Sequence, residues 1–123
     1  MPRSVSILAQ GEYLIASVQS DLSDGEVLEL RDELAERVGR QRARGIVVDV
    51  TALDVIDSFV ARSFRSLAVT AKLRGAETII VGIQPDVAIA MVHFKLNLAP
   101  LRTALDLDEA LAVLDGAKHA PTT

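Results

Sequence analysis

Apolar residues gather in short runs that predict strands. Residues 4–10 and 12–19 carry apolar and β-branched positions on either side of Gly11, a pattern typical of two strands joined by a turn. Residues 45–53 are almost continuously apolar, which favours a strand buried on both faces of a sheet. A β-branched run over residues 77–83 predicts a further strand.

Between these runs, apolar positions recur at the three- and four-residue spacing of a helix. A capping box at residues 23–26 (SDGE) predicts where the first helix begins, and we expect Gly45 to end it in a left-handed conformation. A second helix is expected from near Phe59 to near Gly75. The stripes predicted to face the core are Val27, Leu30, Leu34 and Val38 in the first helix, and Val60, Phe64, Leu67 and Ala71 in the second.

Two more helices are expected toward the C-terminus. Pro85 suits the first turn of a third helix, and a short final helix should run from about residue 108 to 114, capped by Asp106 or Asp108. The predicted order ββαβαβαα implies an α/β fold in which crossover helices pack on a mixed β-sheet.

The length and the lack of repeats favour one domain, which we place at residues 1–118, followed by a flexible tail over 119–123. Hydrophobic residues make up 50% of the chain but aromatic residues only 3%, so the core must consist of Val, Ile, Leu and Ala. The chain has no cysteine and no apolar run near the roughly 20 residues that cross a bilayer. This composition excludes thiol catalysis and fits a cytoplasmic location.

The formal net charge is −4 at pH 7, and basic residues are dispersed among acidic ones. Arg40, Arg42 and Arg44 form the densest basic stretch, which we interpret as a helix C-terminus that complements the helix dipole. Because no basic face is accompanied by stacking aromatic residues, nucleic-acid binding is disfavoured.

The candidate site is the tripeptide Asp57-Ser58-Phe59, which lies where the apolar strand gives way to the second helix. Ser58 falls at or beside the N-cap of that helix. A phosphate on its hydroxyl would meet the positive end of the helix dipole on one side and the carboxylates of Asp54 and Asp57 on the other. Because one side would stabilise the phosphate and the other would repel it, Ser58 is a candidate for a phosphorylation switch. On position alone, the alternative is an ordinary helix cap worth about 1 kcal/mol.

The neighbours of Ser58 keep alternative roles open. Asp57 either caps the helix itself or orients the Ser58 hydroxyl toward a kinase, since Asp and Ser have similar N-cap preferences. Phe59 could anchor a partner, although covering the edge of the sheet is slightly favoured. Asp54, Asp57 and Phe59 are therefore the candidate partner-binding residues, whereas Asp49 is expected to form a structural hydrogen bond.

Catalysis is not expected. A serine nucleophile needs a base, but only His93 and His119 are available, and Ser58 lies in no Gly-x-Ser-x-Gly elbow. His93 is a lone histidine without a ligand cluster, so neither a metal nor another cofactor is predicted. Neither glycine-rich phosphate-binding motif occurs, which leaves nucleotide binding as a weak alternative.

Three segments, taken with the predicted element order, carry a family resemblance: residues 48–59 (VDVTALDVIDSF), 75–85 (GAETIIVGIQP) and 103–106 (TALD). From about Ile7 to Leu114 the chain resembles the STAS domain of bacterial anti-sigma-factor antagonists. Within that family the likeness is greatest to the RsbS-like scaffold proteins of the stressosome, a stress-response signalling assembly.

The resemblance implies that Ser58 is a phosphorylated serine. RsbS-like proteins co-assemble with an RsbR-like STAS scaffold protein and sequester an RsbT-like serine/threonine kinase, which phosphorylates the scaffold and is released. An RsbX-like phosphatase resets the scaffold. A homo-oligomer or dimer is also expected.

Two departures favour the RsbS-like role over the RsbR-like one. RsbR-like domains usually carry a second phospho-threonine in the third helix, where this chain has Ala90 or a neighbour without a hydroxyl. No sensor domain is expected before residue 1. Within the family, a SpoIIAA-type antagonist that binds an anti-sigma kinase directly is the alternative.

Overall fold

The computed structural model describes residues 4–86, 88–89 and 98–118. Its centre is a five-stranded sheet in the order β1-β2-β3-β4-β5, with β1 antiparallel to β2 and the other neighbours parallel. The strands are β1 (Val5–Gln10), β2 (Tyr13–Val18), β3 (Gly45–Asp49), β4 (Glu77–Val81) and β5 (Arg102–Ala104). The sheet is therefore mixed, as the sequence predicts.

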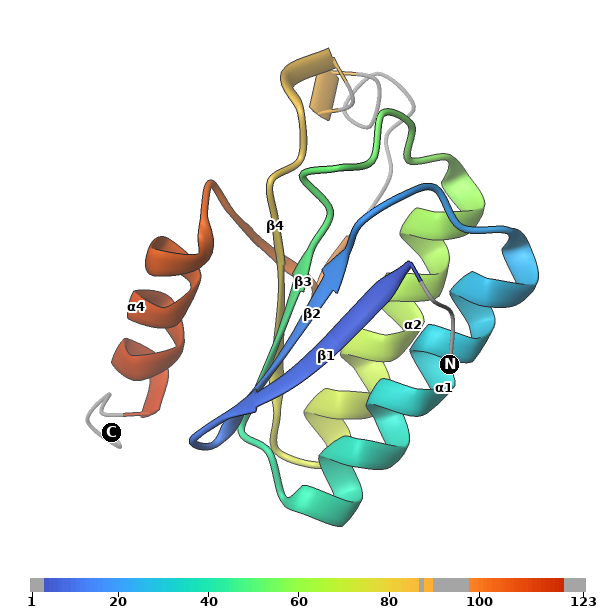
Figure 1. Cartoon of the computed structure of the whole chain (residues 1–123). Helices are drawn as coiled ribbons and strands as arrows, with labels where there is room; N and C mark the ends of the chain where they lie inside the picture. The colour runs from blue at the N-terminus through green and yellow to red at the C-terminus, as the bar shows by residue number, and fades with distance from the viewer. Residues whose placement is uncertain (1–3, 87, 90–97, 119–123) are drawn as a thin grey trace.

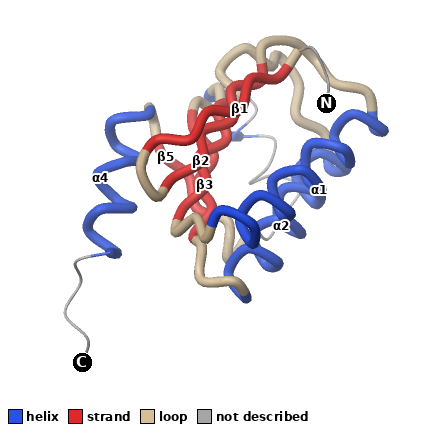
Figure 2. The backbone as a smooth tube through the Cα atoms, turned by 60° about the horizontal axis from the view of Figure 1, so that its bottom comes forward, coloured by secondary structure: helices blue, strands red, loops and turns tan. Residues whose placement is uncertain are grey.

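Helices cover both faces of this sheet (Figures 1 and 2). The helices α1 (Asp24–Gln41) and α2 (Ser58–Leu73) pack side by side on one face. The helix α4 (Leu107–Lys118) lies on the other face, against β3, β4 and β5. This arrangement confirms the predicted α/β class with crossover helices.

The core has a larger part on the α1/α2 face and a smaller part beneath α4. All eight residues of the two predicted helical stripes are buried in the larger part. The central strand β3 is buried along residues 45–48, so its two faces contribute to both parts of the core. The nearly continuous apolar run is thus explained by burial on both faces.

The end of α1 differs from the prediction. Arg42, not Gly45, adopts the left-handed conformation (φ 52°), and its backbone N–H caps the carbonyl of Val38. Gly45 instead begins β3, where an added Cβ would lie 2.8 Å from the side-chain methyl carbons of Leu114. The glycine is therefore explained by close packing against α4 rather than by helix termination.

The C-terminal third also differs from the predicted order. The short strand β5 was not predicted, and α4 begins at Leu107 and continues to Lys118, beyond the expected residue 114. Asp106 is the capping residue, because its carboxylate accepts a hydrogen bond from the Glu109 backbone N–H at 2.8 Å. The helix predicted after Pro85 begins at that residue. Most of it, with Ala90 and His93, and the expected tail over 119–123 lie outside the described residues.

Candidate functional site

The loop from β3 to α2 is held in place by a compact set of hydrogen bonds. The Asp49 carboxylate accepts hydrogen bonds from the backbone N–H of Thr51 at 2.9 Å and from its hydroxyl at 2.6 Å. The Gln84 side-chain amide donates to the carbonyls of Thr51 (3.3 Å) and Leu53 (3.4 Å). Gly82, at φ 84°, lets the chain after β4 pass close to Thr51. Asp49 thus has the structural role expected of it.

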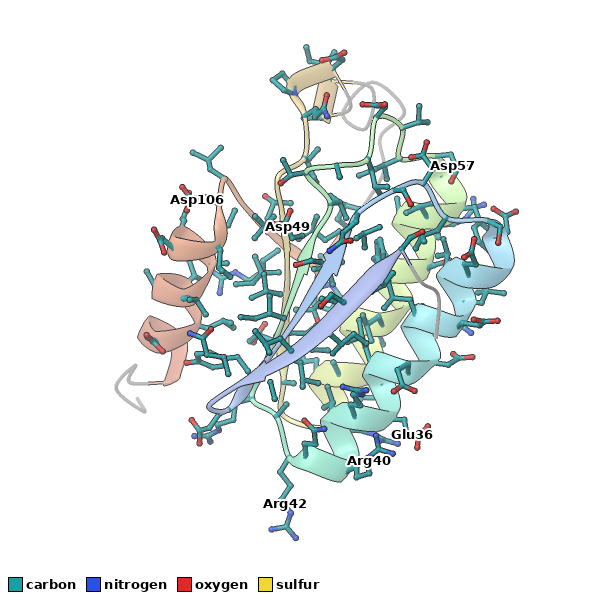
Figure 3. All side chains as sticks on the ribbon, viewed as in Figure 1. Glu36, Arg40, Arg42, Asp49, Asp57 and Asp106 are labelled. Carbon is teal, nitrogen blue, oxygen red and sulfur yellow. The ribbon has the colours of Figure 1, made fainter. Side chains whose placement is uncertain are left out.

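Asp57 is the N-cap of α2 (Figure 3). Its backbone is extended, and its carboxylate accepts a hydrogen bond from the Val60 N–H at 2.9 Å. Its carbonyl accepts the first intrahelical bond, from the Ala61 N–H at 3.1 Å. Of the two roles left open for Asp57, the structure supports capping.

Ser58 is consequently the first residue inside the helix, not its cap. Its side chain is exposed, and its hydroxyl makes no hydrogen bond within the part of the chain that the structure describes. The Asp57 carboxylate binds the Val60 N–H. The N–H groups of Ser58 and Phe59 lie in the first turn of α2 and have no intrahelical acceptor. A free hydroxyl therefore lies beside two free donors at the positive end of α2.

An acidic cleft of about 180 Å³ adjoins this turn. Its carboxylates come from Asp21, Asp24 and Asp57, and its apolar lining comes from Leu22, Val27, Leu53, Val55 and Val60. Val55 is 68% exposed at the rim. The loop before α1 and the loop before α2 meet here because the carboxyl ends of parallel strands lie at one edge of a sheet.

The other predicted site residues differ in their solvent exposure. Asp54 is exposed in the loop, four residues before Ser58 in the chain, and does not line the cleft. Phe59 is partly buried and packs against the larger part of the core, which supports the interpretation that it covers the sheet. Its role as a partner contact stays a prediction. His93 and His119 lie outside the described residues.

Sequence reasoning missed the contribution of the β2–α1 loop to this site. All three of its lining residues are distant from Ser58 in the chain: Asp21 and Leu22 belong to no motif, and Asp24 lies in the capping box, which indicated only the start of a helix. The indication available in the sequence was topological, because strands joined by a crossover helix are parallel and parallel strands end at the same edge of a sheet. Among the described residues, no group of three or more metal-ligating side chains could hold a metal ion. No helix in the described ranges is long and apolar enough to cross a membrane.

A family model described as the STAS domain matches residues 4–110. Among solved structures, RsbS S58E of Moorella thermoacetica superposes with a TM-score of 0.80 at 31% identity, covering 93% of this chain and 97% of that one. A chain from the stressosome, titled a signal integration and transduction hub, superposes with a TM-score of 0.73 at 29% identity, covering 93% and 99% of the two chains.

One of the curated relatives is a longer protein, of which only a part matches this chain. The RsbT co-antagonist protein RsbRA of Bacillus subtilis is 24% identical over 82 residues, which are 67% of this chain and 30% of that protein. The chain thus spans less than a third of that relative's length. These findings confirm the resemblance to the STAS family and to RsbS that the sequence segments predict.

Proposed function

The chain belongs to the STAS domain family, and from that premise we propose that it is a cytoplasmic signalling scaffold switched by phosphorylation of Ser58. In this role it holds an RsbT-like serine/threonine kinase and co-assembles with an RsbR-like STAS protein. An RsbX-like phosphatase removes the phosphate. The likeness to RsbS and to a stressosome chain supports this assignment, and the role requires no catalytic group on the chain itself.

The observation that carries the proposal is the division of roles between Asp57 and Ser58. Because Asp57 caps α2, the Ser58 hydroxyl is exposed and uncommitted. A kinase can modify it without removing any hydrogen bond that holds the helix. The structural alternative, in which Ser58 is itself the cap, does not describe this helix.

A phosphate on Ser58 would be accommodated locally. It adds about −1.5 to −2 charges at pH 7. The free N–H groups of Ser58 and Phe59 and the positive end of the α2 dipole stabilise this charge, whereas the carboxylates of Asp54 and Asp57 repel it. These terms oppose one another, so we expect the fold to persist after modification.

Partner release follows from desolvation. A partner that docks on the exposed Val55 and the first turn of α2 must remove water from the Ser58 side chain. Removing water from a neutral hydroxyl costs little when it finds a partner, but removing it from a phosphate dianion costs far more unless a counter-charge is supplied. Bound kinase should therefore dissociate from the phosphorylated form.

The test is to incubate the chain with ATP and an RsbT-like kinase and then measure its intact mass and map the modified residue. Ser23 is the matched control because it is also an exposed serine at a helix N-terminus, but its hydroxyl accepts a hydrogen bond from the Glu26 N–H at 3.2 Å. We expect one phosphate, on Ser58, which is lost in Ser58→Ala and kept in Ser23→Ala. Modification elsewhere, or none with an active kinase, contradicts the proposal.

A binding measurement completes the test. Ser58→Ala should keep the fold and retain the kinase, while Ser58→Asp should mimic release only in part, because one carboxylate carries less charge than a phosphate. Equal kinase affinity for the two variants would show that Ser58 does not control the interaction. A small complex with one kinase, rather than a large mixed particle with an RsbR-like protein, would identify a SpoIIAA-type antagonist.

A further inference from the structure

A basic groove lies at the end of α2 opposite to Ser58. Its volume is about 480 Å³, and it is formed by the ends of α1 and α2 and by the loops that lead into β3 and β4. Its described lining includes no acidic residue and three arginines: Arg42, Arg44 and Arg74. Positive charge is thus concentrated here, although the whole chain carries a formal net charge of −4.

The cations around this groove are paired with carboxylates, whereas those that line it are not. The three arginines of α1 bind carboxylates of the same helix: Arg31 binds Asp32 at 3.0 Å, Arg37 binds Glu33 at 2.8 Å and Arg40 binds Glu36 at 2.9 Å. Lys72, near the end of α2, binds Glu77 at 3.5 Å. Arg42, Arg44 and Arg74 form no ion pair with the residues that the structure describes. Their charge is therefore available to a ligand.

Arg74 is held across the end of α1 at Gly39. Its Nη1 donates a hydrogen bond to the Ala35 carbonyl at 3.2 Å. A Cβ on Gly39 would overlap with this nitrogen. Glycine inside a helix costs stability relative to alanine, so its presence here is explained by the room that it gives the guanidinium group. One cation of the groove is thus fixed in position before any ligand binds.

Arg42 and Arg44 bring two more cations to the groove from the turn after α1. Arg42 has the left-handed conformation (φ 52°) that glycine or asparagine usually supplies at a helix end, and its exposed side chain extends into solvent (Figure 3). Arg44 is also exposed, and its backbone N–H donates to the Glu12 carbonyl at 2.7 Å. Arg40 is the basic residue in the last turn of α1, where it complements the helix dipole, so that role does not account for Arg42.

We propose that this groove binds an acidic peptide segment of a partner protein. Guanidinium groups bind carboxylates through two parallel hydrogen bonds, and three of them along one groove suit a segment with several aspartates or glutamates. The groove is open, and no aromatic side chain occurs in its described lining. It therefore offers neither the enclosing apolar walls that hold a small cofactor nor the stacking surface that holds a nucleic-acid base.

The position of the groove makes it a docking surface separate from the Ser58 switch. Ser58 begins α2, and Arg74 directly follows its last residue. A helix of 16 residues is roughly 24 Å long, whereas salt screens exposed charges strongly beyond about 8–10 Å. A phosphate on Ser58 should thus leave binding in the groove unchanged, so a partner docked there stays while the kinase leaves.

Fluorescence anisotropy with a short fluorescein-labelled peptide of alternating aspartate and glutamate tests the groove. At about 0.15 M salt, we expect saturable binding with a dissociation constant below about 1 mM. Arg42→Gln and Arg44→Gln should each weaken binding by about two- to fivefold, and the double variant by at least about tenfold. Arg62→Gln is the matched control, because Arg62 is also an exposed arginine but lies in the first half of α2, and it should bind like the wild type.

Gly39→Ala separates binding from stability. The new Cβ displaces the flexible end of Arg74, while alanine favours the helix. We expect binding to weaken by about two- to fivefold, while the urea midpoint stays at or above the wild-type value. Unchanged affinity of Gly39→Ala overturns the role of Arg74.

Three other results overturn the proposal as a whole. The first is a wild type that shows no saturable binding of the acidic peptide. The second is a double variant, Arg42→Gln with Arg44→Gln, that folds by circular dichroism and binds no more weakly than Arg62→Gln. The third is tighter binding of an oligothymidine of equal charge, which would assign the groove to nucleic acid instead.

Discussion

Replacing Asp57 by alanine should destabilise the protein, while replacing Ser58 by alanine should not. The Asp57 carboxylate accepts a hydrogen bond from the Val60 N–H at 2.9 Å and lies at the positive end of α2. Loss of an N-cap side chain costs about 0.5–2 kcal/mol, a range that includes the removal of a favourable charge near the helix dipole. We therefore expect Asp57→Ala to lower the free energy of unfolding by about 1–1.5 kcal/mol.

Ser58→Ala should change the free energy of unfolding by less than about 0.5 kcal/mol, because an exposed side chain without a hydrogen bond is replaced by the best helix former. Asp54→Ala is a charge-matched control for Asp57→Ala, since Asp54 is also an exposed carboxylate near the same turn but is not the cap. Its effect should also stay within about 0.5 kcal/mol.

Urea unfolding followed by far-UV circular dichroism measures all three variants, and thermal unfolding gives an independent ranking. For a chain of this length, each kcal/mol corresponds to roughly 4 °C in the unfolding midpoint. The reasoning is refuted if Ser58→Ala costs as much as Asp57→Ala. In that case Ser58 would hold the helix, and its modification could not be separated from the stability of the fold.

Two further predictions concern the contact between the sheet and α4. The Tyr13 hydroxyl donates a hydrogen bond to the Asp115 carboxylate, which, with burial, raises the Tyr13 pKa from its ordinary value of 10.0 to about 12. This contribution is present below pH 10 and is lost as the pH rises toward 12, so Tyr13→Phe should flatten the fall of stability over that window in urea unfolding. Gly45→Ala should cost about 1–3 kcal/mol, because the new Cβ would lie 2.8 Å from Leu114, and an unchanged urea midpoint would contradict the packing role assigned to Gly45.

The sequence indicated the larger part of the core well because its periodicity is local. Val27 and Leu34 in α1, and Phe64 in α2, repeat at helical spacing and are buried as predicted. In contrast, β5 consists of Arg102, Thr103 and Ala104, of which only Ala104 is buried, so no apolar run marks it. Its pairing with β4 depends on tertiary contacts that a sequence pattern does not contain.

The candidate site could be predicted only in part from the sequence. Ser58 and Asp57 were located by the strand-to-helix junction, but both are good N-cap residues, so the sequence left the cap undecided. The chain path decides it, because Asp57 has the extended backbone of a cap and Ser58 is already helical. The carboxylates of Asp21 and Asp24 reach the site only through the parallel arrangement of β2 and β3.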